Sequence, residues 1–264
     1  MMLPTLFLSH GGGPWPFMKN QLGDAYRQLE ESLQMIPRQL PSPPKAVLMV
    51  SAHWEEDEFT IMTHPKPPML YDYYGFPNHT YHVTYDAKGV PTLAKQVQTL
   101  LEKAGISSHL NPSRGFDHGA FVPMAVMYPD AQIPMLQLSL KRGLNPLEHL
   151  KMGEAIASLR SEGILIIGSG LSYHNLRRFG PMAKEISRDF DQWLHETLQL
   201  SGDDRFKCLV DWENAPSARS AHPREDHLVP VFVSVGAAKD SIARRIYHEN
   251  DFMGGVTASS YWFE

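Results

Sequence analysis

The sequence predicts an α/β fold, with one compact domain in which a central, mostly parallel or mixed sheet carries helices on both faces. Two observations support this prediction. Short and continuously apolar runs, typical of strands covered on both faces, alternate along the chain with longer segments of helical spacing. The 264 residues also suffice for one large hydrophobic core, and no linker, repeat or low-complexity tract divides residues 1–264.

Apolar runs mark the expected strands. The run at residues 46–51 reads Ala-Val-Leu-Met-Val-Ser and contains no charged residue. Such uninterrupted runs are found inside sheets rather than at half-exposed edges. The expected strands are residues 6–9, 46–51, 133–140, 164–170 and 256–263.

Segments of helical spacing separate these strands. In the segment 21–40, the expected buried stripe consists of Leu22, Tyr26, Leu29 and Leu33. A helix at 91–104 starts on a proline and stops near a glycine, as helices commonly do. Further helices are expected at residues 120–128, 147–162, 184–200 and 226–238.

Three stretches lack both patterns. Residues 63–91 are rich in proline, aromatic residues and histidine, which is typical of a long functional loop. Residues 111–119 are expected to form a polar loop, and residues 211–226 a loop or a short helix.

Composition limits the partners and the location that we expect. The net charge is −5, and no block of lysine and arginine is present, so a nucleic-acid partner is not expected. No apolar run reaches the roughly 18 residues of a membrane span, and the N-terminus lacks the basic region of a secretory signal, so we expect a cytoplasmic protein. Cys208 is the only cysteine and is expected at a buried strand or helix edge, as a structural thiol.

Histidines carry the strongest functional signal that the residues give on their own. The chain has 13, and His10, His53 and His174 each follow an apolar run closely. The carboxyl ends of parallel strands line the ligand crevice of α/β sheets, and neutral imidazole is a good ligand for zinc and iron. These positions therefore fit a metal site, although hydrogen-bonded structural histidines fit them too, and no short metal-binding signature is present.

Several motifs, in order along the chain, resemble those of one enzyme family. They are Leu8-Ser9-His10-Gly11-Gly12, Val50-Ser51-Ala52-His53-Trp54, Gly75-Phe76-Pro77, Gly115-Phe116-Asp117-His118-Gly119, Tyr128-Pro129-Asp130-Ala131, the run from Ile133 to Ser139, the run from Ser169 to Leu176, and the run from His222 to Pro230. Together they resemble the DOPA 4,5-dioxygenase-like branch of the class III extradiol ring-cleavage dioxygenases. The resemblance extends from Leu6 to about Ala238.

The resemblance implies a single catalytic domain and a set of site residues. It implies that His10, His53 and His227 hold a divalent metal, and that His174 acts as the general base or as an extra ligand when no substrate is bound. His118 would be a second catalytic residue, touching substrate or lying behind a ligand. Many extradiol enzymes use a carboxylate as third ligand, which makes Glu225 and Asp226 the rivals of His227. The first motif reads His-Gly-Gly-Gly-Pro instead of the usual His-Gly-Ser-Pro.

The implied activity is the insertion of O2 into a catechol, DOPA-like or another aromatic diol, with opening of the ring to a semialdehyde. Fe(II) is expected for this chemistry, although an all-histidine site also suits Zn(II). The partners are then a small aromatic diol and O2, and the oligomeric state is left open. Two alternatives remain: a zinc-dependent hydrolase on the same histidines, and a non-catalytic binding protein of the same fold.

Residues around this site have weaker expectations. Trp54 is expected to pack over the site edge. Arg177 and Arg178 either hold a substrate carboxylate or are solvated. Aromatic residues and histidines of the loop either wall the pocket or pack the loop onto the sheet; they are Tyr71, Tyr73, Tyr74, Phe76, His79, Tyr81, His82 and Tyr85. The remaining histidines expected to be solvated, in loops or on helix surfaces, are His64, His109, His149, His195 and His248.

Overall fold

A six-stranded mixed sheet forms the centre of the computed structural model, which describes residues 2–264. Its strands, in spatial order, are β6 (Met135–Gln137), β2 (Ala46–Ser51), β8 (Ile164–Gly170), β1 (Thr5–Ser9), β10 (Val256–Phe263) and β9 (Ala243–Phe252). The first four are parallel to one another, and β9 and β10 form an antiparallel hairpin at the far edge. The predicted mixed α/β sheet is therefore confirmed.

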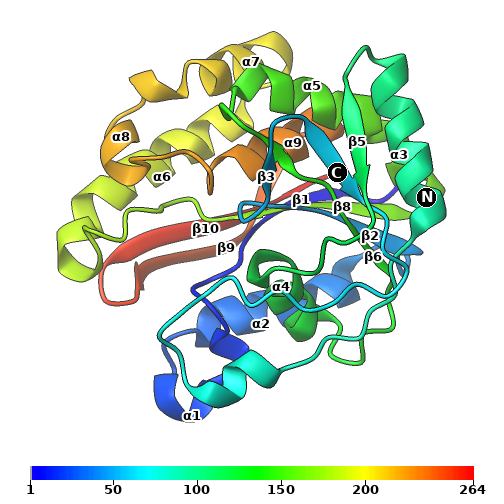
Figure 1. The fold of residues 1–264 in the computed structure, drawn as a ribbon. Coiled ribbons are helices and arrows are strands. Elements are labelled where there is room, and N and C mark those ends of the chain that lie inside the picture. Colours follow the sequence, from blue (N-terminus) through cyan, green and yellow to red (C-terminus); the bar gives the residue numbers. More distant parts are fainter. Residues whose placement is uncertain (1) are drawn as a thin grey trace.

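Helices cover both faces of this sheet (Figure 1). One face carries α3 (Pro91–Lys103), α5 (Pro146–Ile156), α6 (Lys184–Gln199), α7 (Gly202–Val210), α8 (Ala218–Ala221) and α9 (Val229–Ala238). The other carries α1 (Lys19–Leu22), α2 (Arg27–Gln39) and α4 (His118–Met127). Short 3₁₀ turns are η1 (Trp15–Phe17), η2 (Asn78–His82), η3 (Ala157–Glu162), η4 (Gly180–Ala183) and η5 (Trp212–Asn214).

The apolar runs form the fully buried strands of the central sheet. All residues of β1, β2 and β8 lie out of contact with solvent, as the uninterrupted apolar pattern predicts. Helix α9 is buried on all sides between the sheet and α5. Gly153 of α5 and Gly236 of α9 make this close approach possible, since a Cβ atom would lie 2.3 Å from the Val233 oxygen at Gly153 and 2.0 Å from the Leu150 oxygen at Gly236.

Local breaks change the extent of three predicted elements. The segment 21–40 is split because Gly23 has a positive φ of 54°, and α2 begins only at Arg27. The predicted strand at 133–140 becomes β6 and β7 (Leu140–Lys141), which belong to different sheets. The predicted helix at 147–162 ends as an α-helix at Ile156 and continues as η3.

Two small sheets and the edge strand β9 were not predicted. The small sheets pair β3 (Glu55–Glu56) with β7, and β4 (Phe59–Met62) with β5 (Ser108–Asn111). Cys208 lies on α7 and is partly buried rather than fully buried. Among residues 2–264, no helix is both long enough and apolar enough to cross a membrane.

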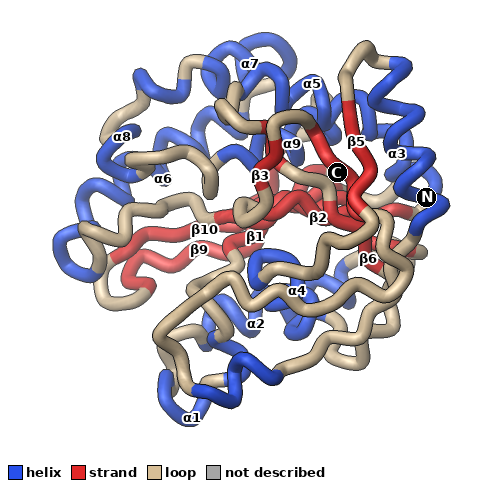
Figure 2. The backbone as a smooth tube through the Cα atoms, viewed as in Figure 1, coloured by secondary structure: helices blue, strands red, loops and turns tan. Residues whose placement is uncertain are grey.

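The long segment after β4 is a loop, as predicted. Residues 63–90 contain only η2, and they form a long tan segment on the side of the sheet that carries α2 and α4 (Figure 2). The hydroxyl of Tyr85 donates to the backbone oxygen of Tyr128, just beyond α4, at 3.0 Å and so fixes the loop to that helix. The Asp72 carboxylate of this loop lies 3.4 Å from Nδ1 of His53, the histidine that follows β2.

Candidate metal centre

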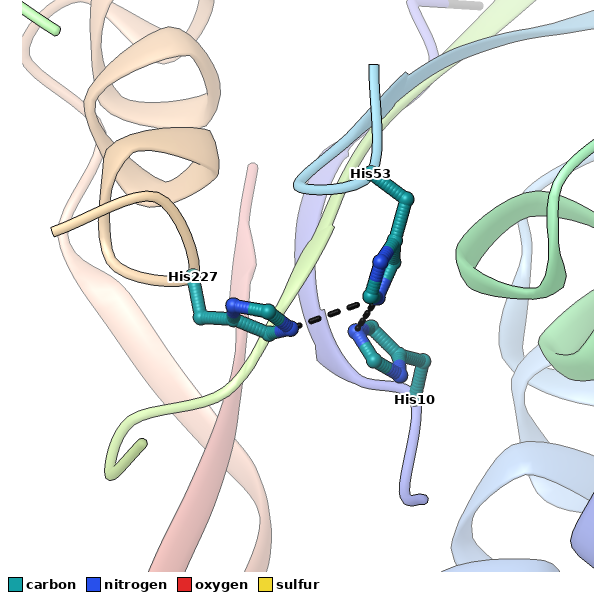
Figure 3. A group of neighbouring side chains, drawn as sticks. All are labelled: His10, His53 and His227. Atoms are coloured by element: carbon teal, nitrogen blue, oxygen red, sulfur yellow. Dashed lines mark hydrogen bonds between the residues drawn. The ribbon is translucent and has the colours of Figure 1, made fainter. Parts of the chain in front are cut away.

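Three imidazoles point at one another at the carboxyl edge of the sheet (Figure 3). His10 follows β1, His53 follows β2, and His227 lies two residues before α9. The Nε2 atom of His53 lies 3.3 Å from Nε2 of His10 and 3.2 Å from Nε2 of His227. Their potential ligand atoms all lie within 4.8 Å of one another, so the structure brings together the three residues that the sequence implied as ligands.

Parallel strands place His10 and His53. Strand β8 lies between β1 and β2, and the chain continues to follow β8 beyond both strands: the backbone N–H of His10 donates to the Gly170 oxygen at 3.1 Å, and that of Ala52 donates to the Ser169 oxygen at 3.0 Å. Both histidines therefore start from the same edge of the sheet.

A buried polar network holds the turn that carries His53. The Ser51 hydroxyl donates to Asp117 Oδ1 at 2.7 Å and accepts from the His53 backbone N–H at 3.2 Å. Arg114 donates to Asp117 Oδ2 at 2.6 Å and to the His53 backbone oxygen at 3.3 Å. Asp117 also caps α4 by accepting from the Ala120 backbone N–H at 3.1 Å.

His227 reaches the centre because α9 begins very close to β8. A Cβ atom at Gly170 would lie 2.1 Å from the His227 backbone oxygen, so only glycine fits. That oxygen accepts a hydrogen bond from the Leu171 backbone N–H at 3.0 Å. The contact fixes the start of α9 against the end of β8.

The arrangement of protons at these nitrogens fits a cation. Nδ1 of His227 lies 2.7 Å from Asp226 Oδ2, and because a carboxylate accepts only, Nδ1 carries the proton and Nε2 a lone pair. A single N–H on His53 Nε2 could serve only one of its two Nε2 neighbours. A tetrahedral metal with nitrogens at about 2.0–2.1 Å would separate those nitrogens by about 3.3–3.4 Å, close to the two distances from His53 Nε2 to His10 Nε2 and His227 Nε2.

Burial keeps the three rings neutral. Loss of solvent lowers the pKa of His10, His53 and His227 well below the ordinary histidine value, and neighbouring imidazoles lower the pKa further. Neutral imidazole is the form that binds metals, so these rings need no deprotonation at neutral pH.

His174 and His118 adjoin different members of this group, His227 and His53 respectively. The His174 ring stacks on His227, with centroids 3.4 Å apart, and shares a second group of possible ligand atoms with Asp226 and His227 rather than joining the first. Burial lowers the pKa of His174, against the opposing effect of Asp226. The His118 ring lies 3.9 Å from the His53 ring and belongs to α4. The structure thus gathers all five predicted histidines.

The two rival carboxylates do not join the central group. Glu225 accepts from Arg219 at 2.5 Å, and Asp226 lies behind His227 on its Nδ1 side. The sequence reasoning missed Asp72, whose carboxylate lies 2.9 Å from His118 Nδ1 and 3.4 Å from His53 Nδ1. An acidic residue inside an aromatic run, Tyr71-Asp72-Tyr73-Tyr74, was the available signal.

Several expectations for the surroundings are corrected. His149 is fully buried rather than solvated, because its two ring nitrogens bond to the backbone at Asn145 and Lys141. His109 and His248 are exposed as expected, but they lie on strands β5 and β9, and His64 and His195 are half-buried.

The aromatic residues of the loop differ in their exposure to solvent. Tyr73 is buried 5.8 Å from the His118 ring, and burial raises its pKa to about 12. Tyr74 is 91% exposed.

Two expectations concern residues outside this loop. Trp54 is buried beside the turn that carries His53, and the Arg114 guanidinium lies over the Trp54 ring, 4.8 Å from the ring centroid. Arg177 and Arg178 are exposed.

Comparison with known proteins decides the family. The model of the catalytic LigB subunit of aromatic ring-opening dioxygenase matches residues 4–264. The chain belongs to the LigB family of ring-opening dioxygenases. It is 36% identical to a 4,5-DOPA dioxygenase extradiol of Beta vulgaris, over 98% of this chain and 96% of that one, and 38% identical to one of Portulaca grandiflora, over 84% and 83%.

A solved structure has a similar fold. An uncharacterized protein of Escherichia coli K12 superimposes with a TM-score of 0.81 at 29% identity, covering 99% of this chain and all of the other. Family and relatives together identify this LigB-family chain as an extradiol ring-cleaving dioxygenase, a class that uses a divalent metal. The histidine group described above is its candidate metal site.

Proposed function

We propose that this dioxygenase opens a catechol between one hydroxyl-bearing carbon and its unsubstituted neighbour, with Fe(II) held by His10, His53 and His227. The observation that carries the proposal is that His53 Nε2 lies 3.3 Å from His10 Nε2 and 3.2 Å from His227 Nε2, with possible ligand atoms of all three histidines within 4.8 Å of one another. Bound ferrous iron supplies the electron transfer that lets dioxygen react with an electron-rich ring.

His174 is the proposed general base. Its ring lies against His227, so it borders the metal centre without belonging to the three-histidine group. Because burial lowers its pKa, its imidazole is neutral at neutral pH and ready to accept the proton of a catechol hydroxyl. Asp226, beside it, favours the imidazolium that results.

His118, which adjoins His53, is the proposed second catalytic residue. Its Nδ1 faces Asp72 at 2.9 Å, so Nε2 is the nitrogen free to meet substrate or oxygen. Tyr73 covers this side and helps to exclude water.

The relatives named as DOPA dioxygenases make DOPA the first substrate to test. Arg177 and Arg178, exposed just after His174, are the proposed partners of its carboxylate. Catechols with and without a carboxylate should then differ in KM more than in kcat. Equal KM values for DOPA and 4-methylcatechol would remove the arginines from the proposal.

Metal loading tests the proposal directly. Metal-free protein is loaded anaerobically with Fe(II) or with Zn(II), and then mixed with each catechol in aerated buffer. We expect oxygen uptake equal to the catechol consumed, and a yellow semialdehyde, with Fe(II) only. No uptake by the iron-loaded protein with any catechol would contradict ring opening, and ester hydrolysis by the zinc-loaded protein would favour a hydrolase, since three nitrogen ligands also suit zinc.

A further inference from the structure

Asp72 contacts two histidines of the candidate metal centre, His53 and His118. It lies in the loop 63–90, and its carboxylate stands between two imidazoles. Oδ1 accepts from the His118 backbone N–H at 3.0 Å and lies 2.9 Å from His118 Nδ1. Oδ2 lies 3.4 Å from His53 Nδ1, longer than an ordinary hydrogen bond, and is the acidic oxygen that faces that nitrogen. The Asp72 side chain is only 18% exposed.

An ionised carboxylate has no proton to donate, and this restricts both rings. A ring nitrogen that faces it is stabilised as N–H, so the proton of a neutral imidazole stays on Nδ1 and the lone pair on Nε2. On His53 that lone pair points to the Nε2 atoms of His10 and His227. On His118 it leaves Nε2 as an acceptor on the side of the ring away from Asp72.

We propose that Asp72 is a positioning residue that sets the tautomers of His53 and His118 together, so that one loop carboxylate prepares a metal ligand and a substrate-side histidine at once. The inference rests on the proposed function, because it assigns His53 to the metal and His118 to the substrate. It adds a residue of the loop to a site otherwise built from strand ends and a helix start.

Replacement by asparagine separates this role from simple packing. The His118 backbone N–H requires an acceptor, so the amide oxygen of Asn would occupy the Oδ1 position and its NH2 group would face His53 Nδ1. A donor at that position places the His53 proton on Nε2, the nitrogen directed at the metal. Replacement by alanine removes the charge as well, but leaves His53 free to choose its tautomer.

The experiment measures zinc affinity by chelator competition for the wild type, Asp72→Ala, Asp72→Asn and Asp86→Asn. Asp86 is an exposed carboxylate of the same loop and serves as the matched control. We expect Asp72→Asn to bind zinc about 10–100-fold more weakly than wild type, which is typical when a ligand's hydrogen-bond partner is altered. Asp72→Ala should lie between the two, and Asp86→Asn should equal wild type.

Two results would overturn the inference while the proposed function stands. One is wild-type affinity in Asp72→Asn, and the other is weaker binding by Asp72→Ala than by Asp72→Asn, which would indicate lost charge or packing instead of donor direction. Failure of the wild type itself to bind zinc would overturn the metal centre along with the inference.

Nitrogen NMR of the zinc-loaded wild type gives a readout that needs no variant. In protein labelled with 15N-histidine, correlation of ring nitrogens with ring protons reports the tautomer of each imidazole. We expect His53 and His118 to carry their protons on Nδ1. A proton on Nε2 of either ring would contradict the role of Asp72, even if the asparagine variant fails to fold.

Discussion

The candidate metal centre and the corner between β7 and α5 both bury histidines, but their ring nitrogens have different partners. At the corner, His149 Nδ1 donates to the Asn145 oxygen at 2.7 Å and Nε2 accepts from the Lys141 N–H at 3.1 Å. At the centre, His53 Nε2 lies 3.3 Å from His10 Nε2 and 3.2 Å from His227 Nε2. Burial lowers the pKa in both places. What distinguishes the candidate centre is therefore that ring nitrogens of three histidines face one another, whereas each ring nitrogen of His149 has a backbone partner.

Removal of a central imidazole should give the largest effect. In His53→Ala, only two inward nitrogens remain, and we expect the metal content to fall from about one ion per chain to almost none. Ring opening should fall below detection. Metal analysis of the purified variant checks this, and retention of a full equivalent of metal would break the contrast, since His53 would then be no more a ligand than His149.

His174→Ala sharpens the contrast within the centre itself. If His174 is the base, its loss should lower kcat by about 10²–10⁴-fold, the usual contribution of general base catalysis, while the metal stays bound by the other three. Steady-state kinetics and metal analysis measure the two quantities. Parallel loss of metal and activity would instead make His174 a fourth ligand.

His149 should contribute to the free energy of unfolding and not to metal affinity. His149→Leu removes two side-chain hydrogen bonds to the backbone, with the Asn145 oxygen and the Lys141 N–H, at a cost on the order of 1–3 kcal/mol in the free energy of unfolding. Urea unfolding of the metal-free protein measures this value. Zinc affinity equal to that of wild type is the matching expectation, and a large loss of affinity would show that the corner and the centre are coupled.

The same residue predicts how stability changes with pH. Burial lowers the pKa of His149 to about 4, while the unfolded chain keeps the ordinary histidine value. The unfolded state therefore binds more protons between about pH 6.5 and pH 4, so stability is fully present above that window and is lost as pH falls through it. His149→Leu should flatten this part of the stability profile, and an unchanged profile would assign the dependence to other buried groups.

The smallest effect is expected at an exposed histidine. His109 lies on β5 with its Nε2 2.8 Å from Glu58, and an exposed pair of this kind contributes about 0–1 kcal/mol. His109→Ala should therefore leave zinc affinity, kcat and the unfolding midpoint near wild-type values. A clear loss of metal in this variant would indicate a second site on the surface.

The site histidines were predictable to the extent that regular elements carry them. His10, His53 and His174 follow fully buried strands, whose apolar runs are easily recognised. His227 stands before a helix, so strand ends gave no signal for it, and only the family resemblance implied it. Asp72 was missed because its loop has no period from which a neighbour can be inferred.

The central strands were predictable because they are fully buried and therefore apolar. The elements that were not predicted are partly exposed or depend on contacts between distant segments. Strand β9 has no apolar run because, as an edge strand, it exposes residues such as Arg244 and His248. The short pairs β3–β7 and β4–β5 depend on contacts between distant segments that no local pattern records.

Two of the proposed ligands follow strands that do not touch each other. Neighbouring strands are about 4.8 Å apart, so β1 and β2, on either side of β8, are separated by about twice that distance. The chain at the end of β8 admits the third histidine instead, because a Cβ atom at Gly170 would lie 2.1 Å from the His227 backbone oxygen. The distance between neighbouring strands therefore sets how far apart His10 and His53 begin. Loops above the sheet can change to admit a different aromatic substrate, while the distance between the strands stays the same.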